Sequence, residues 1–472
     1  MVGIARRHLK FAAAMLAGSL VVLASVAAWQ EVSRTDPVAT TAEPTTTLAT
    51  TPETTTSTKP PALLTIRPAD RGAISVGTSG TKLAGSLVTF VKSLPADACL
   101  VVDEGNSRVV AHRSTNVLAP ASTQKLFTAT AVLNVLGPEH RFTTQVVSSA
   151  PLQGSTIAGD VYLVGDGDPV LSTTTYQASQ RHQPALATSI ELLADRVVAA
   201  GVKRVTGTII GDEHKFANDR FLPTWGYPYD YTTRTGPLSA LVLNDGWIAS
   251  DQVQPDPPAF AARSLQRLLE KRGVTFGAQA ISGQAPSVVT TLASVESPQL
   301  QAIVDEMLRN SDNMTAELLA KDLDVARHGI GRIDTAALTV LSTLKEEGFA
   351  LDGVDMRDAS GTDKANRASC ADLVYMLHSI GNASDTSGNG LPTAGMTGTL
   401  SARYNNTAAA GRVHAKTGSI LGAAALAGFV DPPPGSREPE ITFAFLVNGT
   451  DNDTRYTLED NLIDVLASWN LG

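Results

Sequence analysis

A serine followed three residues later by a lysine can perform nucleophilic chemistry. A lysine that is deprotonated near neutral pH can take the proton of a nearby hydroxyl group and turn that hydroxyl into a nucleophile. The chain of 472 residues contains the pattern three times, as Ser79 with Lys82, Ser122 with Lys125, and Ser342 with Lys345. Chance alone explains three copies, so the surrounding sequence must distinguish them.

The second copy opens an apolar run that is typical of a helix. Residues 122–136 read STQKLFTATAVLNVL, and Gly137 with Pro138 ends the run. A purely structural helix start favours Glu or Gln at the third position, whereas Lys125 opposes the helix dipole. The same field lowers the pKa of a lysine, and residues three apart share one helix face. We therefore predict that Ser122 both begins the helix and acts as a nucleophile, with Lys125 as its base.

The other two copies lack this context. Ser79 and Lys82 lie in a Gly/Ser-rich segment in which we expect no helix. Ser342 and Lys345 lie inside a helical pattern that begins well before them. We interpret both copies as accidental.

A second short motif, Ser311-Asp312-Asn313, separates two amphipathic stretches within residues 300–320. The same triplet also suits an ordinary turn or a helix N-cap. Its position between two predicted helices, downstream of the first motif, makes Ser311 and Asn313 candidates for catalysis.

A third motif, Lys416-Thr417-Gly418-Ser419, ends the predicted strand GRVHAKTG. A glycine on a strand allows the backbone of a ligand to approach closely. The lysine and the threonine offer a positive charge and a hydroxyl group to a carboxylate. A Thr-Gly pair at a strand end is also common turn chemistry, so this motif gains its meaning from the other two.

The elements around these motifs indicate an α+β fold, in which an antiparallel sheet is flanked by helices. An inserted α/β unit, with short strands and two helices, lies between the first and second motifs. The expected elements are strands at 99–105, 108–113, 161–165 and 204–212, strands within 411–448, and helices at 86–94, 186–200, 258–271, 298–347, 370–380 and 457–468.

The composition excludes nucleic acid as a partner. The net charge is −9 and the sequence pI is near 5.4, and the sequence contains no clustered basic stripe. No histidine spacing supports a zinc site. The stretch GDGDP at 165–169 resembles the start of a calcium loop, but Gln177 stands where a bidentate Glu is needed. We expect no metal and no cofactor.

The N-terminal segment predicts export. Arg6, Arg7 and Lys10 precede an uncharged stretch at 11–29, which is long for a signal peptide and just long enough to span a bilayer. Residues 1–29 are therefore a signal peptide or a membrane anchor, and we expect an extracytoplasmic protein, anchored in the membrane by 11–29 or secreted after cleavage.

The segment that follows, residues 30–72, is rich in Thr and Pro and predicts a disordered stalk. The folded part contains only two cysteines, Cys99 and Cys370. In an exported protein such a pair suits a disulfide, although two buried thiols are the alternative.

The three motifs in this order are those of the penicillin-interacting serine enzymes. GDVYLVGDGDPVLS, GPLSALVLNDG, DASGTDKANRASCADLVYML and GTLSARYNNTAAAGRVHAKTG, together with PASTQKLFTATAVLNVLGPEHRFTT, resemble the D-alanyl-D-alanine carboxypeptidase/endopeptidase family of penicillin-binding protein 4 type. The resemblance extends from about residue 84 to 470. It implies a penicillin-binding, β-lactamase-like transpeptidase fold, hydrolysis of D-Ala-D-Ala bonds or D-Ala cross-links in peptidoglycan stem peptides, and acylation by β-lactam inhibitors.

The resemblance also implies a role for each motif residue. Ser122 would be acylated, with Lys125 as its general base. Ser311 would relay a proton to the leaving amine with the help of Lys416, and Asn313 would bind the peptide amide of the substrate. Thr417 and Ser419, beside Gly418, would bind the terminal carboxylate, and the backbone N–H groups of Ser122 and Ser419 would form the oxyanion hole.

The chain departs from the family after Asn244, where a longer β-rich segment is usual. We therefore expect the peptidase domain at 83–150 and 292–472, and a shortened inserted domain at 151–291.

Two other functions remain as alternatives. A β-lactamase with a Ser-Asp-Asn motif needs an E-x-x-x-N arrangement downstream of it, and the only match, Glu306 to Asn310, lies upstream. The second alternative is a non-catalytic cell-wall binding or sensor protein, which the intact motifs disfavour. The absence of G-x-S-x-G disfavours a Ser-His-Asp esterase.

Overall fold

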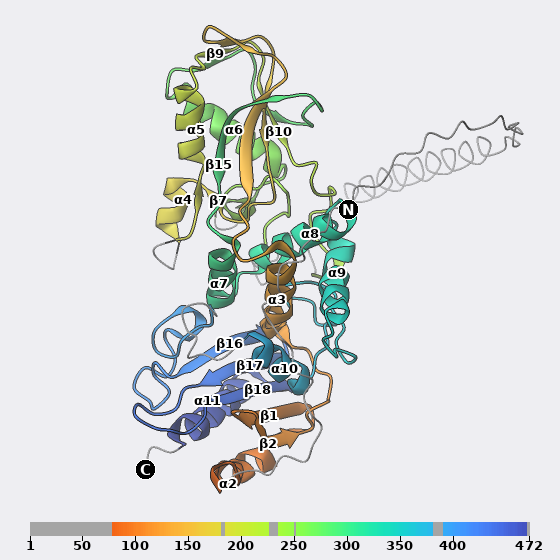
Figure 1. The fold of residues 1–472 in the computed structure, drawn as a ribbon, viewed down its shortest axis with the longest axis vertical. Helices are drawn as coiled ribbons and strands as arrows, with labels where there is room; N and C mark the ends of the chain where they lie inside the picture. The colour runs from red at the N-terminus through yellow and green to blue at the C-terminus, as the bar shows by residue number, and fades with distance from the viewer. Residues whose placement is uncertain (1–77, 181–184, 226–234, 250–251, 381–389, 470–472) are drawn as a thin grey trace, which may run out of the picture. The chain divides into compact units, whose positions relative to one another are not determined.

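The structure is a computed structural model that describes residues 78–180, 185–225, 235–249, 252–380 and 390–469 (Figure 1). The chain divides into two compact units, 1–71 and 72–472, and every described residue lies in the second. The predicted signal or anchor at 1–29 and the stalk at 30–72 lie outside the described residues. Within the described part, no helix is long and apolar enough to cross a membrane.

The main sheet has five antiparallel strands in the order β16-β17-β18-β1-β2. Its central strands are buried throughout because helices cover both faces of the sheet. The strands are β1 (Ala98–Glu104), β2 (Ser107–His112), β16 (Val413–Ile420), β17 (Ala423–Val430) and β18 (Ile441–Asn448).

Alternate residues of β18 face opposite layers of helices, as the period of a strand requires. Phe443 and Phe445 pack against one layer, α2 and α11, while Ala444 and Leu446 pack against the other. The outer layer consists of α2 (Thr78–Ser93) and α11 (Asn452–Ser468), and the other contains α3 (Lys125–Leu136), α7 (Leu300–Asn310), α8 (Asn313–His328), α9 (Ile333–Glu346) and α10 (Cys370–Ile380).

A second, mixed sheet has the strand order β14-β10-β6-β3-β15. Helices α5 and α6 pack against it and share its core. Its elements are β3 (Thr143–Ser148), β6 (Val161–Val164), β10 (Ile209–Asp212), β14 (Ile281–Ser282), β15 (Thr290–Glu296), α5 (Ile190–Ala199) and α6 (Pro257–Glu270). The sheet therefore includes one strand before residue 151 and one that ends after residue 291.

Short elements complete this part of the chain. They are β4 (Leu152–Gln153), β5 (Thr156–Ile157), β7 (Leu171–Ser172), β8 (Thr188–Ser189), β9 (Arg204–Val205), β11 (Trp247–Ala249), β12 (Gln252–Val253), β13 (Thr275–Phe276), α4 (Thr174–Ser179) and the 3₁₀ turns η2 (Pro223–Trp225) and η3 (Asn244–Gly246). The expected single strand at 204–212 is wrong, because β9 and β10 belong to different sheets.

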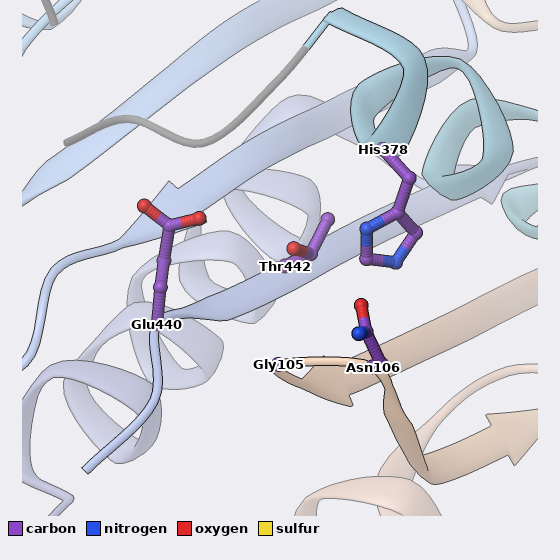
Figure 2. A pocket seen from close by; sticks show the side chains of 5 residues that line it. All are labelled: Gly105, Asn106, His378, Glu440 and Thr442. Carbon is purple, nitrogen blue, oxygen red and sulfur yellow. The ribbon is translucent and has the colours of Figure 1, made fainter. Parts of the chain in front are cut away.

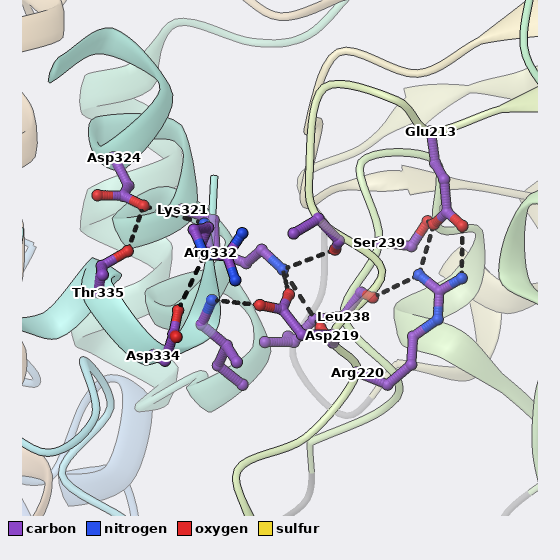
Figure 3. A network of polar contacts seen from close by, with 12 residues as sticks. Glu213, Asp219, Arg220, Leu238, Ser239, Lys321, Asp324, Arg332, Asp334 and Thr335 are labelled. Atoms are coloured by element: carbon purple, nitrogen blue, oxygen red, sulfur yellow. Dashed lines mark hydrogen bonds and ion pairs between the residues drawn. The ribbon is translucent and has the colours of Figure 1, made fainter. Parts of the chain in front are cut away.

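A polar network connects the second-sheet region to α8 (Figure 3). Lys321 of α8 is fully buried and forms an ion pair with Asp219. Asp219 also accepts a hydrogen bond from the backbone N–H of Ile333 at 2.9 Å. Beside this pair, Arg220 forms an ion pair with Glu213. The network fixes the loop after β10 against the helix that begins at Asn313.

The structure joins Cys99 of β1 to Cys370 at the start of α10 in a disulfide bond. Both residues are fully buried in the core that α3, α7, α8, α9 and α10 share with the main sheet. The bond links two segments that are 271 residues apart.

Candidate active site

Ser122 lies in a tight turn directly before α3. The turn is a 3₁₀ helix, η1 (Ala121–Gln124), so the α-helix begins at Lys125 rather than at Ser122 as predicted. Ala121 has a φ of 47°, a left-handed conformation that non-glycine residues rarely adopt. A strained residue of this kind, here directly before Ser122, is typical of functional sites.

Lys125 is fully buried and makes three short polar contacts. Its Nζ atom lies 3.0 Å from the Oγ atom of Ser122. It also lies 2.6 Å from Oδ1 of Asn313 and 2.6 Å from the backbone oxygen of Ser360. The first two motifs are therefore in direct contact, and Lys125 is within reach of the proton that it would abstract.

The Ser-Asp-Asn motif forms the junction between α7 and α8. Ser311 ends α7 with a φ of 60°, and Asp312 is the N-cap of α8, where its carboxylate accepts a hydrogen bond from the N–H of Thr315 at 2.9 Å. The capping role predicted for the triplet thus belongs to Asp312. This leaves the side chains of Ser311 and Asn313 to face the two lysines.

Lys416 brings the third motif to the same place. This fully buried residue lies on β16, and its Nζ atom is 2.8 Å from Oγ of Ser311 and 2.8 Å from the backbone oxygen of Thr417. The hydroxyl of Thr417 lies 2.7 Å from that of Thr399. The motif lies within the strand rather than at its end, since β16 continues to Ile420.

Gly418 allows β16 to pass close to Ser122. A Cβ atom at this position would lie 2.8 Å from the backbone oxygen of Pro120 and 3.1 Å from the backbone nitrogen of Ser122. Ala415 donates its N–H to the edge of the sheet, toward Pro392, at 3.0 Å. Because backbone groups alternate along a strand, Ser419 directs its N–H to the same edge.

Burial determines the protonation of the two lysines. Removal from water lowers the pKa of Lys125 to about 8, although the negative charges of Asp358, Glu317 and Asp312 oppose this shift. Burial and the nearby charge of Lys125 hold the pKa of Lys416 well below its usual range. The predicted lowering of the Lys125 pKa therefore has burial, rather than the helix dipole, as its main cause.

Two buried carboxylates behind the lysines were not among the predicted site residues. Glu317 lies on α8, and Asp358 lies in the loop after α9. Burial, followed by the charge of Asp358, raises the pKa of Glu317 to about 8. The available signal was a Glu four residues after Asn313, on the same face of a helix that is buried along most of its length.

The first two motifs open onto a cleft with a volume of about 1270 Å³. Ser122, Ser311, Asn313 and Thr399 line the cleft together with residues that lie between the first two motifs in the sequence, including Tyr176. A much smaller hollow of about 160 Å³ lies beside the β1–β2 turn, where His378 and Asn106 face each other across it (Figure 2).

The first and third Ser-x-x-Lys copies lie elsewhere. Ser342 is inside α9, as predicted, and its hydroxyl donates to the backbone oxygen of Thr339 at 3.2 Å. The prediction that no helix surrounds Ser79 and Lys82 is wrong, because both lie in the first turns of α2.

The chain is similar to a known family of peptidases. The profile of the D-Ala-D-Ala carboxypeptidase 3 (S13) family matches residues 94–257 and 252–469, which together form most of the chain. The chain belongs to this family. It is therefore a peptidase hydrolase with D-alanyl-D-alanine carboxypeptidase function, and the predicted resemblance, fold class and enzyme class are confirmed.

Characterised relatives of this S13 peptidase match along most of their length. It is 27% identical over 434 residues to the D-alanyl-D-alanine carboxypeptidase of Actinomadura sp. (strain R39), covering 75% of this chain and 77% of that protein. It is 30% identical over 370 residues to carboxypeptidase DacB of Mycolicibacterium smegmatis, covering 75% of this chain and 76% of that protein.

Among solved structures, the S13 peptidase is similar to penicillin binding protein 4 (dacB) from Haemophilus influenzae. The TM-score is 0.67 at 20% identity, and the alignment covers 81% of this chain and 99% of that one. The same Haemophilus influenzae protein complexed with a novel β-lactam gives a TM-score of 0.60 at 21% identity, covering 80% of this chain and 98% of that one. Family membership favours the peptidase over the β-lactamase and the non-catalytic alternatives.

Proposed function

We propose that the S13 peptidase forms its acyl-enzyme on Ser122, with Lys125 as the general base. The observation that carries this proposal is the separation of 3.0 Å between Nζ of Lys125 and Oγ of Ser122, where residues of all three motifs meet. The substrate is the D-alanyl-D-alanine end of a peptidoglycan stem peptide, and a D-Ala cross-link between two stem peptides is a second substrate of the same chemistry.

Acylation exchanges one bond and moves two protons, one from Ser122 onto Lys125 and one from Lys416 through Ser311 onto the leaving group. Neutral Lys125 takes the hydroxyl proton of Ser122 while Oγ forms a bond to the carbonyl carbon of the penultimate D-Ala. The bond from that carbon to the nitrogen of the terminal D-Ala then breaks. Ser311 passes a proton to this leaving nitrogen, and Lys416, at 2.8 Å, supplies the proton to Ser311.

The backbone beside Gly418 suits the developing oxyanion. We place the oxygen between the N–H groups of Ser122 and Ser419, a pair of donors worth about 3 to 4 kcal/mol each in comparable sites. The hydroxyls of Thr417 and Ser419 bind the terminal carboxylate, and Asn313 binds the peptide amide. Water then attacks the ester on Ser122 and releases the shortened peptide.

The inserted domain is shortened in this chain. The two segments of the family match meet at residues 252–257, and the described residues between η3 and α6 form only the short strands β11 and β12. This supports the loss of most of the β-rich segment at that point. Because β3 and β15 belong to the second sheet, we propose residues 143–296 as the extent of the insert, in place of 151–291.

The protein acts outside the cytoplasm, where its peptidoglycan substrate and β-lactam inhibitors are found. We propose that residues 11–29 either anchor the protein in the membrane or are removed by a signal peptidase after export. Phase partitioning of the full chain after expression in a bacterial host tests this proposal, with deletion of 1–29 as the control.

Substitution Ser122→Ala tests the nucleophile. We expect it to abolish covalent labelling by a fluorescent penicillin while the circular dichroism spectrum is unchanged. Ser342→Ala is the matched control, because it removes the same hydroxyl from an unused copy of the pattern. Persistent labelling of Ser122→Ala would overturn the assignment. Mass spectrometry of the products from a cross-linked muropeptide dimer separates release of D-Ala from cleavage of the cross-link.

A further inference from the structure

The loop after α9 makes a fully buried turn at residues 358–361 beside Lys125. The turn contains no residue of the three motifs. However, the backbone oxygen of its Ser360 accepts a hydrogen bond from the Lys125 amine. The loop also packs against the 3₁₀ turn η1, which contains Ser122. A Cβ atom at Gly361, whose φ is 83°, would lie 1.9 Å from the backbone oxygen of Ala121.

Glu317 of α8 binds the backbone of this turn. Its Oε1 atom accepts hydrogen bonds from the N–H groups of Ala359 at 3.0 Å and Ser360 at 2.7 Å. Glu317 is 2% exposed, so water does not compete for these donors. The opposite side of the turn is held by Thr128 of α3, whose hydroxyl donates to the backbone oxygen of Ala359 at 2.7 Å.

The contacts of Lys125 determine the direction of its lone pair. A neutral amine has two N–H donors and one lone pair. Oδ1 of Asn313 and the carbonyl oxygen of Ser360 can only accept hydrogen bonds, so they take both donors. The lone pair is then left for the third neighbour, the hydroxyl of Ser122 at 3.0 Å. If the Ser360 carbonyl moves away, the amine can rotate and its lone pair no longer has a fixed direction.

We propose that Glu317 is a positioning residue, which fixes the Ser360 carbonyl so that the lone pair of the neutral Lys125 amine points at the Ser122 hydroxyl. Glu317 itself touches neither the substrate nor the reacting atoms. This role of Glu317 rests on the proposed function of Ser122 and Lys125. Through Glu317, the helix that carries Asn313 also helps to orient Lys125.

Three substitutions separate the position of the acceptor from the carboxyl group itself. Glu317→Gln keeps a carbonyl oxygen for both N–H groups but replaces the carboxyl group by an amide. Glu317→Asp keeps the carboxyl group but withdraws the acceptor by one methylene. Glu317→Met has a similar length and no strong acceptor. The measurement is acylation of the full chain by a fluorescent penicillin, analysed for non-covalent binding and for the acylation rate constant separately.

We expect the Gln variant to acylate at close to the original rate. The Asp variant is slowed about tenfold and the Met variant about 100-fold, the loss that misplacing a catalytic group by roughly 1 Å can cause. Non-covalent binding stays unchanged in all three. A Gln variant as slow as the Met variant, or an Asp variant at the original rate, contradicts the proposal. If the Met variant does not fold, the acylation rate constants of the Gln and Asp variants still test the positioning role of Glu317.

Asp324→Asn provides the matched control. Asp324 is a fully buried carboxylate on the same helix, and its partners are the N–H of Arg332, the hydroxyls of Thr335 and Thr339 and the ring of His328. Its substitution lowers stability without changing the acylation rate constant. Labelling that survives in Ser122→Ala overturns the proposed nucleophile. Loss of labelling in Ser122→Ala with an original rate in Glu317→Asp overturns only the role of Glu317.

Discussion

The Nζ atom of Lys416 lies 2.8 Å from the Oγ atom of Ser311, although 105 positions separate the two residues in the sequence. Both atoms are held on rigid elements, one on β16 and one at the α7–α8 junction. Burial and the nearby charge of Lys125 hold the pKa of Lys416 well below its usual range, which favours loss of its proton. Ser311 stands between that proton and the cleft.

Substitution Ser311→Ala should break this path. We expect the rate of acylation by a fluorescent penicillin to fall by about 10² to 10⁴, the usual contribution of a general acid or base. The thermal unfolding midpoint should change little, since Ser311 is only partly buried. Rapid-quench labelling provides the measurement, with Ser342→Ala as the control. An acylation rate within experimental error of the original would remove Ser311 from the mechanism.

The pH dependence of acylation should report Lys125. With a pKa of about 8, roughly a tenth of this residue is neutral at pH 7, compared with less than about a thousandth at the ordinary value. The base must be neutral, so the rate rises about tenfold per unit below pH 8 and levels off above it. Labelling rates between pH 6 and 9.5 measure this. A rate independent of pH over that range would argue against a titrating lysine base.

Substitution Gly418→Ala should impair the site through the backbone. The added Cβ would lie 2.8 Å from the backbone oxygen of Pro120, so β16 must move away from Ser122. We expect acylation to fall by at least about tenfold, because oxyanion donors act only at a fixed distance.

Gly85→Ala provides the glycine control for this experiment. Gly85 lies exposed on α2, and a Cβ there meets nothing within 4 Å. Alanine at this position should stabilise the helix by about 0.5 to 1 kcal/mol and leave labelling unchanged. Equal acylation rates in the two variants would show that the approach of β16 to Ser122 has no catalytic role.

Removal of the disulfide should lower stability but not activity. Cys99→Ala combined with Cys370→Ala frees two segments that are 271 residues apart, and loss of a native disulfide typically costs about 2 to 5 kcal/mol. Neither cysteine side chain takes part in the hydrogen bonds of the motif residues described above. We expect a lower thermal unfolding midpoint with normal labelling at room temperature. An identical midpoint for the double variant and the original chain would contradict this.

The elements that carry the motifs could be predicted because each motif coincides with a change in hydrophobic pattern. Ser311 interrupts two amphipathic stretches, and Lys416 lies in a run of alternating strand residues. The start of α2 around Ser79 could not be predicted in this way. Its first turn is rich in Gly, Ser and Thr, and helical packing against α11 overrides their weak propensity.

The environment of Lys125 could be predicted only in part. The sequence shows its distance from Ser122 along the chain, but the burial that lowers its pKa comes from residues that lie far away in the sequence. Asn313 is 188 positions from Lys125, and Ser360 is 235 positions away. For the same reason, no local sequence pattern predicts the contact between Glu317 and Ala359. The stretch around residue 360 contributed only to the family resemblance.

The edge strand β16 has two halves with different neighbours. Backbone groups of Val413 and Ala415 bond to Ala394 and Pro392, which cover the first half of the strand. An exposed sheet edge is a template on which any extended chain, including another copy of the protein, can add a strand. In the described part of the chain, this cover ends where the Lys-Thr-Gly motif begins. The protein therefore limits its exposure to self-association to the few residues of β16 from that motif onward, where we propose that the peptide binds.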